Sequence, residues 1–125
     1  MYLHLEIEAQ CIGCCYKEAL TDVDKALKIG PENVFALENR GAVHRMLSNY
    51  YQALIDLEKA LEIDPQDVFA LGTRGVVQRM LKNYDKELID LDKALKIDPE
   101  NVIALGNRGE TRGVVQLMLK TTTKH

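Results

Sequence analysis

The sequence predicts an all-α protein made of about three and a half helical hairpins, seven helices in all. Its three prolines, Pro31, Pro65 and Pro99, recur with a constant 34-residue period, and a fixed period of this size indicates a repeat architecture. The segments that begin at Val34 and Val68 are identical at 22 of 34 positions. Apolar residues recur at helical spacing twice in each unit, so each unit is predicted to be a pair of helices.

The repeats organise the chain as a single domain over residues 1–125. The predicted units are a degenerate N-terminal unit at about 1–33, complete units at 34–67 and 68–101, and a half-repeat cap at 102–120, followed by a tail at 121–125. A single hairpin cannot bury its own apolar face, so neighbouring units are expected to stack on one another.

Turn and proline positions set the expected helix boundaries. Polar pairs, Ser48-Asn49 and Lys82-Asn83, separate the two helices of the complete units and precede Tyr50 and Tyr84. Between units, proline disfavours helix at the residue before it and opens the next helix. Asp or Asn residues nearby are candidate N-caps.

The two end units depart from the repeat. In the N-terminal unit Ile7 stands where Gly41 and Gly75 stand in the complete units. A terminal repeat without a predecessor can drift, so we interpret this unit as a cap. In the last unit, Thr73–Gln78 recurs at Thr111–Gln116, four residues out of register, and one extra turn rotates the helix face by roughly 40°.

That last helix is left with apolar residues that no second helix covers. Val114, Leu117 and Met118 are therefore candidates for a homo-oligomer contact, or the chain is a truncated piece of a longer array. The alternative is that the helix covers the preceding hairpin and frays at Thr121.

Opposite charges recur at the same period. An arginine precedes the glycine of each first helix, and an aspartate lies midway along each second helix; these are Arg40, Arg74 and Arg108, and Asp22, Asp56 and Asp90. We predict ion pairs between Arg40 and Asp56 and between Arg74 and Asp90, with Arg108 left without its counterpart. The alternative is two independently solvated faces.

Glu87 breaks the repeat, because it occupies the position of Ala53 in the preceding unit. A carboxylate buried there without a partner would cost on the order of 1–3 kcal/mol. On that basis Glu87→Ala is expected to raise thermal stability.

These residues together resemble the tetratricopeptide repeat family. The matching positions are Gly41, Gly75 and Gly109 of the first helices, Tyr50, Tyr84, Ala53, Ala60 and Ala94 of the second helices, and the three prolines. The resemblance implies a right-handed α-α superhelix and a non-catalytic scaffold that binds a protein or peptide partner in a concave groove lined by the first helices. A structural or self-assembly module, associating through the C-terminal half-repeat, is the alternative.

The resemblance also implies which side chains line that groove. The candidate partner-binding residues are Phe35, Asn39, Arg45, Met46, Phe69, Thr73, Val76, Arg79, Met80, Ile103 and Asn107. Aromatic and methionine anchors with arginines suit a peptide that carries apolar side chains and an acidic group. The alternative is that these residues pack against neighbouring repeats and the arginines are solvated.

One binding mode of the family is not expected in this chain. Members that clamp the C-terminal carboxylate of chaperone tails carry lysine and asparagine on one first helix, asparagine on the next, and lysine and arginine on the third. Asn39 matches the middle asparagine, but His4 and Glu8 precede it and Phe69 and Thr73 follow it. The cations are missing, so chaperone-tail binding is not predicted.

Composition and motifs exclude most other classes. A formal charge of -3 with mixed signs provides no positive field for nucleic acid, and no apolar run reaches the length of a membrane span. Enzyme motifs are absent, and no cofactor is expected. Cys11, Cys14 and Cys15 with His4 are a weak candidate for a metal site, against packing or incidental free thiols. The lack of a secretion signal favours a cytoplasmic or nuclear, reducing compartment.

Overall fold

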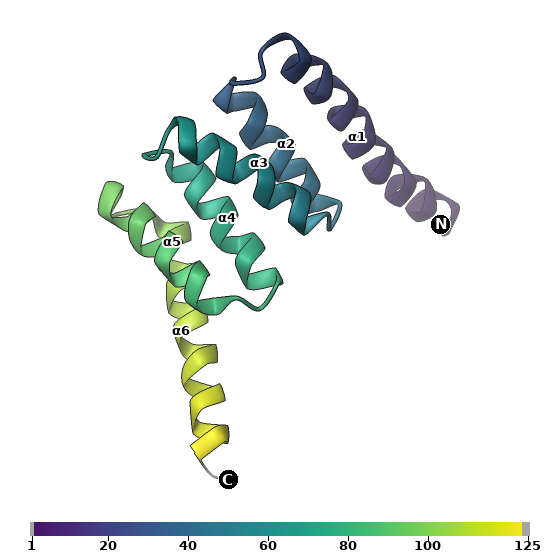
Figure 1. The fold of residues 1–125 in the computed structure, drawn as a ribbon. Coiled ribbons are helices and arrows are strands. Elements are labelled where there is room, and N and C mark those ends of the chain that lie inside the picture. The colour runs from purple at the N-terminus through teal and green to yellow at the C-terminus, as the bar shows by residue number, and fades with distance from the viewer. Residues whose placement is uncertain (1, 124–125) are drawn as a thin grey trace. The chain divides into compact units, whose positions relative to one another are not determined.

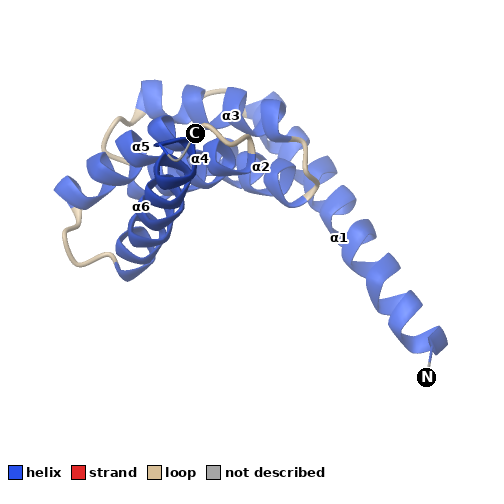
Figure 2. Cartoon of the chain, turned by 90° about the horizontal axis from the view of Figure 1, so that it is seen from below, coloured by secondary structure: helices blue, strands red, loops and turns tan. Residues whose placement is uncertain are grey.

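The computed structural model describes residues 2–123, with side chains described for residues 13–122, and every regular element in this range is a helix. The helices are α1 (Tyr2–Ile29), α2 (Val34–Met46), α3 (Tyr50–Ile63), α4 (Val68–Met80), α5 (Tyr84–Ile97) and α6 (Val102–Thr123) (Figure 1). Short loops join them, and the described range contains no strand (Figure 2). The predicted all-α class is confirmed, with six helices within residues 2–123 rather than seven.

The missing helix boundary lies in the N-terminal unit, where α1 continues through residues 14–15. In the complete units the turn residues Ser48 and Lys82 have positive φ angles of 61° and 64°. The asparagine that follows each of them bonds back across the turn: the Asn83 side-chain amide, for example, donates to Gln78 Oε1 at 2.9 Å. Cys15 stands at that asparagine position and has only a weak S–H donor, so nothing competes with the continuous helix.

The predicted N-caps are confirmed at three starts of first helices. Asn33, Asp67 and Asn101 each accept a hydrogen bond from the backbone N–H three residues ahead, at 3.0, 3.1 and 3.0 Å. Such a cap satisfies one of the free N–H groups in the first helical turn. The repeat therefore restarts its helix in the same way at each of these three positions.

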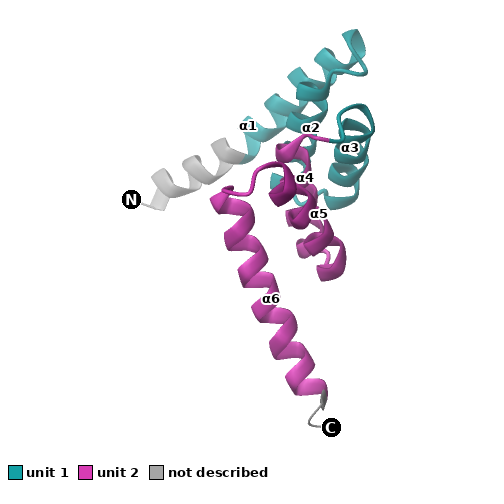
Figure 3. Cartoon of the chain, turned by 90° about the vertical axis from the view of Figure 1, so that its left-hand side faces the viewer, with its two compact units in different colours: residues 1–65 teal, residues 66–125 magenta. Residues whose placement is uncertain are grey.

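The chain divides into two compact units, residues 1–65 and residues 66–125 (Figure 3). In unit 1, α2 packs against α1 and α3; in unit 2, α5 packs against α4 and α6. The buried apolar residues of unit 1 include Leu37, Ala53, Leu57 and Ala60, and those of unit 2 include Val77, Leu91, Leu95 and Ala104. The division falls at the junction of the two complete repeats.

Glycine allows close approach within the first complete hairpin. A Cβ atom added at Gly41 would lie 2.8 Å from Leu57 Cγ, which is too close for a real contact. At Gly75 the nearest atom would be 3.6 Å away, an ordinary contact. Glycine is therefore required for the close approach of α2 and α3 at Gly41 but not for the looser contact at Gly75.

The last helix has two different halves. Its N-terminal half covers α5 and buries Ala104 and Thr111, whereas Leu117 and Leu119 are 66% and 58% exposed. The helix does not fray at Thr121 but continues to Thr123, past the predicted boundary at residue 120. The Thr121 hydroxyl bonds to the carbonyl oxygen of Met118 at 2.8 Å, which satisfies a backbone acceptor in the last turns.

Candidate functional site

In unit 1 the predicted binding residues lie on α2. Phe35 is 72% exposed and Met46 is 48% exposed, while Asn39 and Arg45 are half-buried. The Nε atom of Arg45 is buried and has no hydrogen-bond partner among the described residues. This helix therefore presents two apolar side chains and a cation that no described carboxylate engages.

In unit 2 the predicted residues lie on α4 and α6. Phe69 and Met80 on α4 and Ile103 on α6 are exposed, at 53%, 52% and 75%. The half-buried members of the set are Thr73, Val76, Arg79 and Asn107. Phe35, Phe69 and Ile103, which share one position of the repeat, are thus all exposed.

Arg79 differs from Arg45 because acidic groups of its own unit engage it. Its Nη1 lies 3.4 Å from Glu110 Oε2, and its Nε lies 3.6 Å from Glu87 Oε1. Glu87 is completely buried, so this interaction also compensates a buried charge. An acidic ligand at Arg79 would have to compete with two carboxylates.

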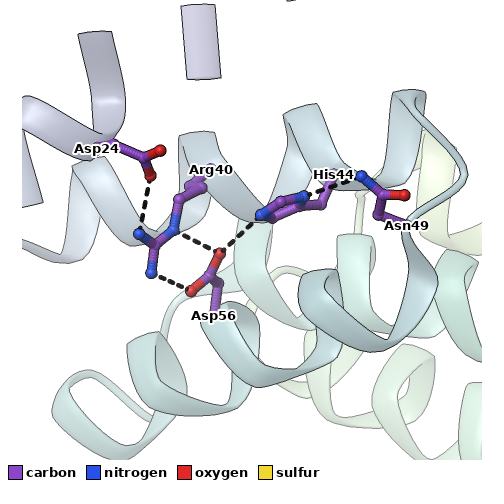
Figure 4. A network of polar contacts seen from close by, with 5 residues as sticks. All are labelled: Asp24, Arg40, His44, Asn49 and Asp56. Atoms are coloured by element: carbon purple, nitrogen blue, oxygen red, sulfur yellow. Dashed lines mark hydrogen bonds and ion pairs between the residues drawn. The ribbon is translucent and has the colours of Figure 1, made fainter. Parts of the chain in front are cut away.

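A network of polar side chains links α1, α2 and α3 in unit 1 (Figure 4). Arg40 donates from Nε and Nη2 to the two carboxylate oxygens of Asp56 at 2.8 and 2.7 Å, and from Nη1 to Asp24 at 3.0 Å. His44 Nε2 lies 3.9 Å from Asp56, and His44 Nδ1 lies 3.4 Å from the Asn49 amide. Hydrogen bonding to Asp56 raises the pKa of Arg40 above its normal high value, so one permanent cation joins three helices.

The predicted pairing in the second complete unit is also confirmed. Arg74 donates to Asp90 from Nε at 2.9 Å and from Nη2 at 2.7 Å, the same two-pronged geometry as Arg40 with Asp56. Fork-like pairs of this kind are among the strongest side-chain hydrogen bonds.

Arg108 lacks the following-helix aspartate that Arg40 and Arg74 bind, as the repeat predicts, but it is not unpaired. Its Nη1 donates to Asp92 at 3.0 Å, and this aspartate lies on the preceding helix rather than on a following one. The bond matches that of Arg40 to Asp24, since both join residues 16 positions apart. The sequence held this signal, because Asp24 and Asp92 occupy the same position of the repeat.

Glu87 is not an unpartnered carboxylate, contrary to the sequence-based expectation. The Thr111 hydroxyl donates to its Oε2 at 2.8 Å, and both residues are buried. Burial raises the pKa of Glu87, while the Thr111 hydrogen bond and Arg79 oppose that rise. Because Glu87 has partners, we no longer expect Glu87→Ala to raise thermal stability.

A hollow between α5 and α6 was not predicted from the sequence. Its volume is about 440 Å³, and its lining includes Tyr84 and Lys86 of α5 and Val115, Met118 and Leu119 of α6. The four-residue register shift of the last helix is the only sequence feature that indicates it, since this shift leaves apolar residues beyond the end of a normal first helix.

The candidate metal site receives no support from the described residues. Cys14 and Cys15 are exposed free cysteines, which confirms the expectation of free thiols at these two positions. His4, Glu8 and Cys11 lie outside the residues whose side chains are described. Over the described part of the chain, no cluster of three or more metal-ligating residues occurs, and no helix there is long and apolar enough to cross a membrane.

Comparison with known proteins identifies the repeat. Residues 34–67 match the tetratricopeptide repeat family model. The TPR domain of Arabidopsis OM64 is 28% identical, with a TM-score of 0.78 over 85% of this chain and 88% of that chain. A MamA RS-1 double mutant is 29% identical, with a TM-score of 0.75 over 88% of this chain and 61% of that chain.

A third similar structure contains a bound peptide. The first TPR of Spaghetti (RPAP3), bound to the HSP90 peptide SRMEEVD, is 19% identical, with a TM-score of 0.80 over 87% of this chain and 86% of that chain. The comparison with curated proteins gives no significant match. The resemblance to a tetratricopeptide repeat protein, inferred from the sequence, is confirmed by the family match and by the fold.

Proposed function

We propose that this protein is a non-catalytic interaction scaffold that binds a peptide or a partner segment along the exposed faces of its first helices. The observation that carries the proposal is the exposure of Phe35, Phe69 and Ile103 at one repeat position. Exposed large apolar side chains at regular spacing are typical of binding surfaces rather than of a solvated face. The peptide-bound RPAP3 domain, which is similar in fold, supports the same class of function.

The chemistry of α2 favours a ligand with apolar side chains and an acidic group. Phe35 and Met46 offer apolar contacts, and Arg45 offers a cation with no ion-pair partner among the described residues. A carboxylate of the ligand would gain a charge-assisted hydrogen bond there. Arg79 is a weaker candidate because Glu87 and Glu110 already engage it.

The proposal does not extend to the chaperone tail seen with RPAP3. That similarity is one of fold at 19% identity, and Phe69 and Thr73 still stand where a cation of the carboxylate clamp is expected. We also propose a cytoplasmic or nuclear location, which suits the exposed thiols of Cys14 and Cys15.

The experiment that tests peptide binding compares two exposed residues. Short peptides are selected from a displayed library with the wild-type protein, and their affinities are measured by fluorescence polarisation. Phe69→Ala should weaken binding by about 30-fold, equivalent to about 2 kcal/mol for an aromatic anchor. Ile89→Ala is the matched control, because Ile89 is 54% exposed, against 53% for Phe69, but lies on the second helix α5.

The outcome decides the proposal only if both variants stay folded, which circular dichroism verifies. Peptides that lose affinity with Phe69→Ala and keep it with Ile89→Ala support the binding face. Equal affinity for wild type and Phe69→Ala, and likewise for Phe35→Ala, would place the ligand elsewhere.

A second candidate function is self-assembly through the C-terminal half-repeat. Val114, Leu117 and Met118 are exposed, at 37%, 66% and 52%, on a helix that extends nine residues beyond the length of α2 or α4. Light scattering over a concentration series tests it: Leu117→Lys should dissolve an oligomer held by this face. A molecular mass that Leu117→Lys leaves unchanged at every concentration contradicts this contact.

A further inference from the structure

Both end helices run straight where the complete repeats turn. The turn positions of the repeat, 48–49 and 82–83, correspond to 14–15 in α1 and to 116–117 in α6, and both helices continue through them. From residue 16 onward α1 therefore matches a second helix, without a first helix folded back against it. In the same way α6 matches a first helix, packed on α5 of the preceding repeat, and within residues 2–123 no helix follows it to complete its hairpin.

The face of α6 that should receive a second helix is open. Leu105 is 43% exposed, whereas its counterparts Leu37 and Leu71 are 1% and 3% exposed. A Cβ atom added at Gly109 would meet no described atom within 4 Å, whereas Gly41 is packed against Leu57. The close-approach surface of the hairpin is thus present in α6 but uncovered.

On this face, the Arg108 guanidinium donates a hydrogen bond to a described residue from only one of its nitrogen atoms. Arg40 gives Nη1 to an aspartate of the preceding helix, and gives Nε and Nη2 to Asp56 of the following helix. Arg108 gives Nη1 to Asp92 of the preceding helix, and its Nε and Nη2 have no partner among the described residues. The two remaining donors have the geometry that binds a carboxylate in the complete repeats.

The complementary half lies on α1. Asp22 occupies the repeat position of Asp56 and Asp90; it is exposed, whereas each of those is 3% exposed. Ala26 is likewise exposed, while its counterparts Ala60 and Ala94 are fully buried. The positions from which the chain would supply the missing partners hold Glu6 for Asp22 and Lys124 for Arg108, and each has the same charge sign as the residue it would have to bind.

We propose that copies of this protein associate head to tail, with α6 of one copy packed against residues 16–29 of α1 in the next. The Nε and Nη2 atoms of Arg108 bind the Asp22 carboxylate of the next copy, and Gly109 lets the two helices approach closely. The contact repeats the geometry of the complete hairpins, so it completes a repeat from two chains. Such a contact is heterologous, because α6 of one copy meets α1 of another, so further copies are expected to add as the concentration rises.

This face is distinct from the one that contains Leu117 and from the exposed residues of the peptide proposal. Leu105, Arg108 and Gly109 point to the side that a second helix occupies in the complete repeats. The head-to-tail proposal can therefore be wrong while the peptide-binding proposal is correct, and the peptide-binding proposal can be wrong while the head-to-tail proposal is correct.

A charge swap tests the proposal by sedimentation velocity and light scattering over a concentration series. The wild-type mass should rise with concentration, and Asp22→Arg alone and Arg108→Asp alone should each remain monomeric because like charges then meet at the contact. An equimolar mixture of the two variants should regain the rise, since the introduced arginine of one then meets the introduced aspartate of the other. Circular dichroism verifies that each variant is folded.

A second pair of variants tests the same contact without changing any charge. Gly109→Leu should abolish the rise in mass without unfolding the chain, because its side chain enters open space in the single copy. Gly106→Leu is the control on the same helix, since the corresponding position of the complete repeat already carries the half-buried Glu38.

Four outcomes would overturn the proposal. These are a monomeric wild type at every concentration, a mass rise that Asp22→Arg and Arg108→Asp leave intact, a mixture of the folded variants that stays monomeric, and a loss of assembly with Leu117→Lys but not with Gly109→Leu. The last outcome would assign the contact to the other face of α6.

Discussion

The α2–α3 and α4–α5 hairpins belong to repeats identical at 22 of 34 positions, yet they close differently. In the first hairpin the backbone at Gly41 lies so close to Leu57 that a methyl group would overlap it. In the second, Gly75 leaves room for an ordinary contact. The shared residues determine the turn, the caps and the Arg–Asp pair, while the remaining positions determine how tightly the two helices pack.

One position that differs between the two hairpins lies beside these glycines. The first hairpin has the fully buried Ala53 where the second has the fully buried Glu87. The larger side chain is tolerated because α6 supplies the Thr111 hydroxyl and α4 supplies Arg79. Glu87 therefore links three helices of unit 2, as Arg40 does in unit 1.

The largest expected effect tests what the hairpins share. Arg40→Ala and Arg74→Ala should each lower the free energy of unfolding by about 3 kcal/mol, because each leaves a buried aspartate without its partner. Double-mutant cycles with Asp56→Ala and Asp90→Ala, measured by urea denaturation, should give similar coupling energies in the two hairpins. A cycle without coupling in either hairpin would remove the structural role of its pair.

The next effect tests what differs between them. Gly41→Ala should destabilise the protein by roughly 1–3 kcal/mol, since the new methyl group meets the buried Leu57 side chain. Gly75→Ala should be neutral or stabilising by up to about 1 kcal/mol, because the methyl fits and alanine favours helix. Melting temperatures of the two variants check this, and equal losses would contradict the difference in closeness.

A smaller effect concerns the Glu87–Thr111 pair. Glu87→Ala and Thr111→Val should each cost about 1–2 kcal/mol, because each leaves the other polar group buried and without its hydrogen bond. The double variant should cost less than the sum of the two, since both groups are then replaced by apolar ones, as in the first hairpin. Additive losses in chemical denaturation would show that the hydrogen bond does not couple the two residues.

The smallest effect is a dependence on pH. The pKa of Glu87 is raised in the folded protein because of burial, so its contribution to stability is greatest below its unfolded pKa and is lost as the pH rises through the folded value. Relative to wild type, Glu87→Gln should thus become more stable as the pH rises from about 4 to about 7. A constant difference in stability over this range would contradict the shift.

The sequence predicted well those features that repeat. Three prolines and two turn pairs located the loops between the helices, although each first helix begins three residues after its proline rather than at it. The period of Arg40 and Arg74 predicted their pairing with the aspartates 16 positions later. These features depend on local turn chemistry and on a fixed helical register, which a second copy of the unit makes visible.

The features that occur once were missed. Helix α1 is continuous because Cys15 stands where the complete repeats carry the turn asparagine. The absence of a turn residue is harder to recognise in a sequence than its presence. Thr111 was not linked to Glu87 because each replaces an apolar residue of the repeat, Val77 and Ala53, in a different helix. Considered together, these two polar replacements would have indicated a buried hydrogen bond.

The pattern of helix packing has a consequence for how the protein folds. Within each unit the packed pairs are consecutive in sequence: α1 with α2, α2 with α3, α4 with α5 and α5 with α6. Bringing such neighbours together closes only short loops, and proteins dominated by local contacts fold in microseconds to milliseconds. Folding can therefore start in either complete hairpin. Hydrogen exchange measured during refolding should show protected amides in both hairpins before the amides of α1 and α6 become protected.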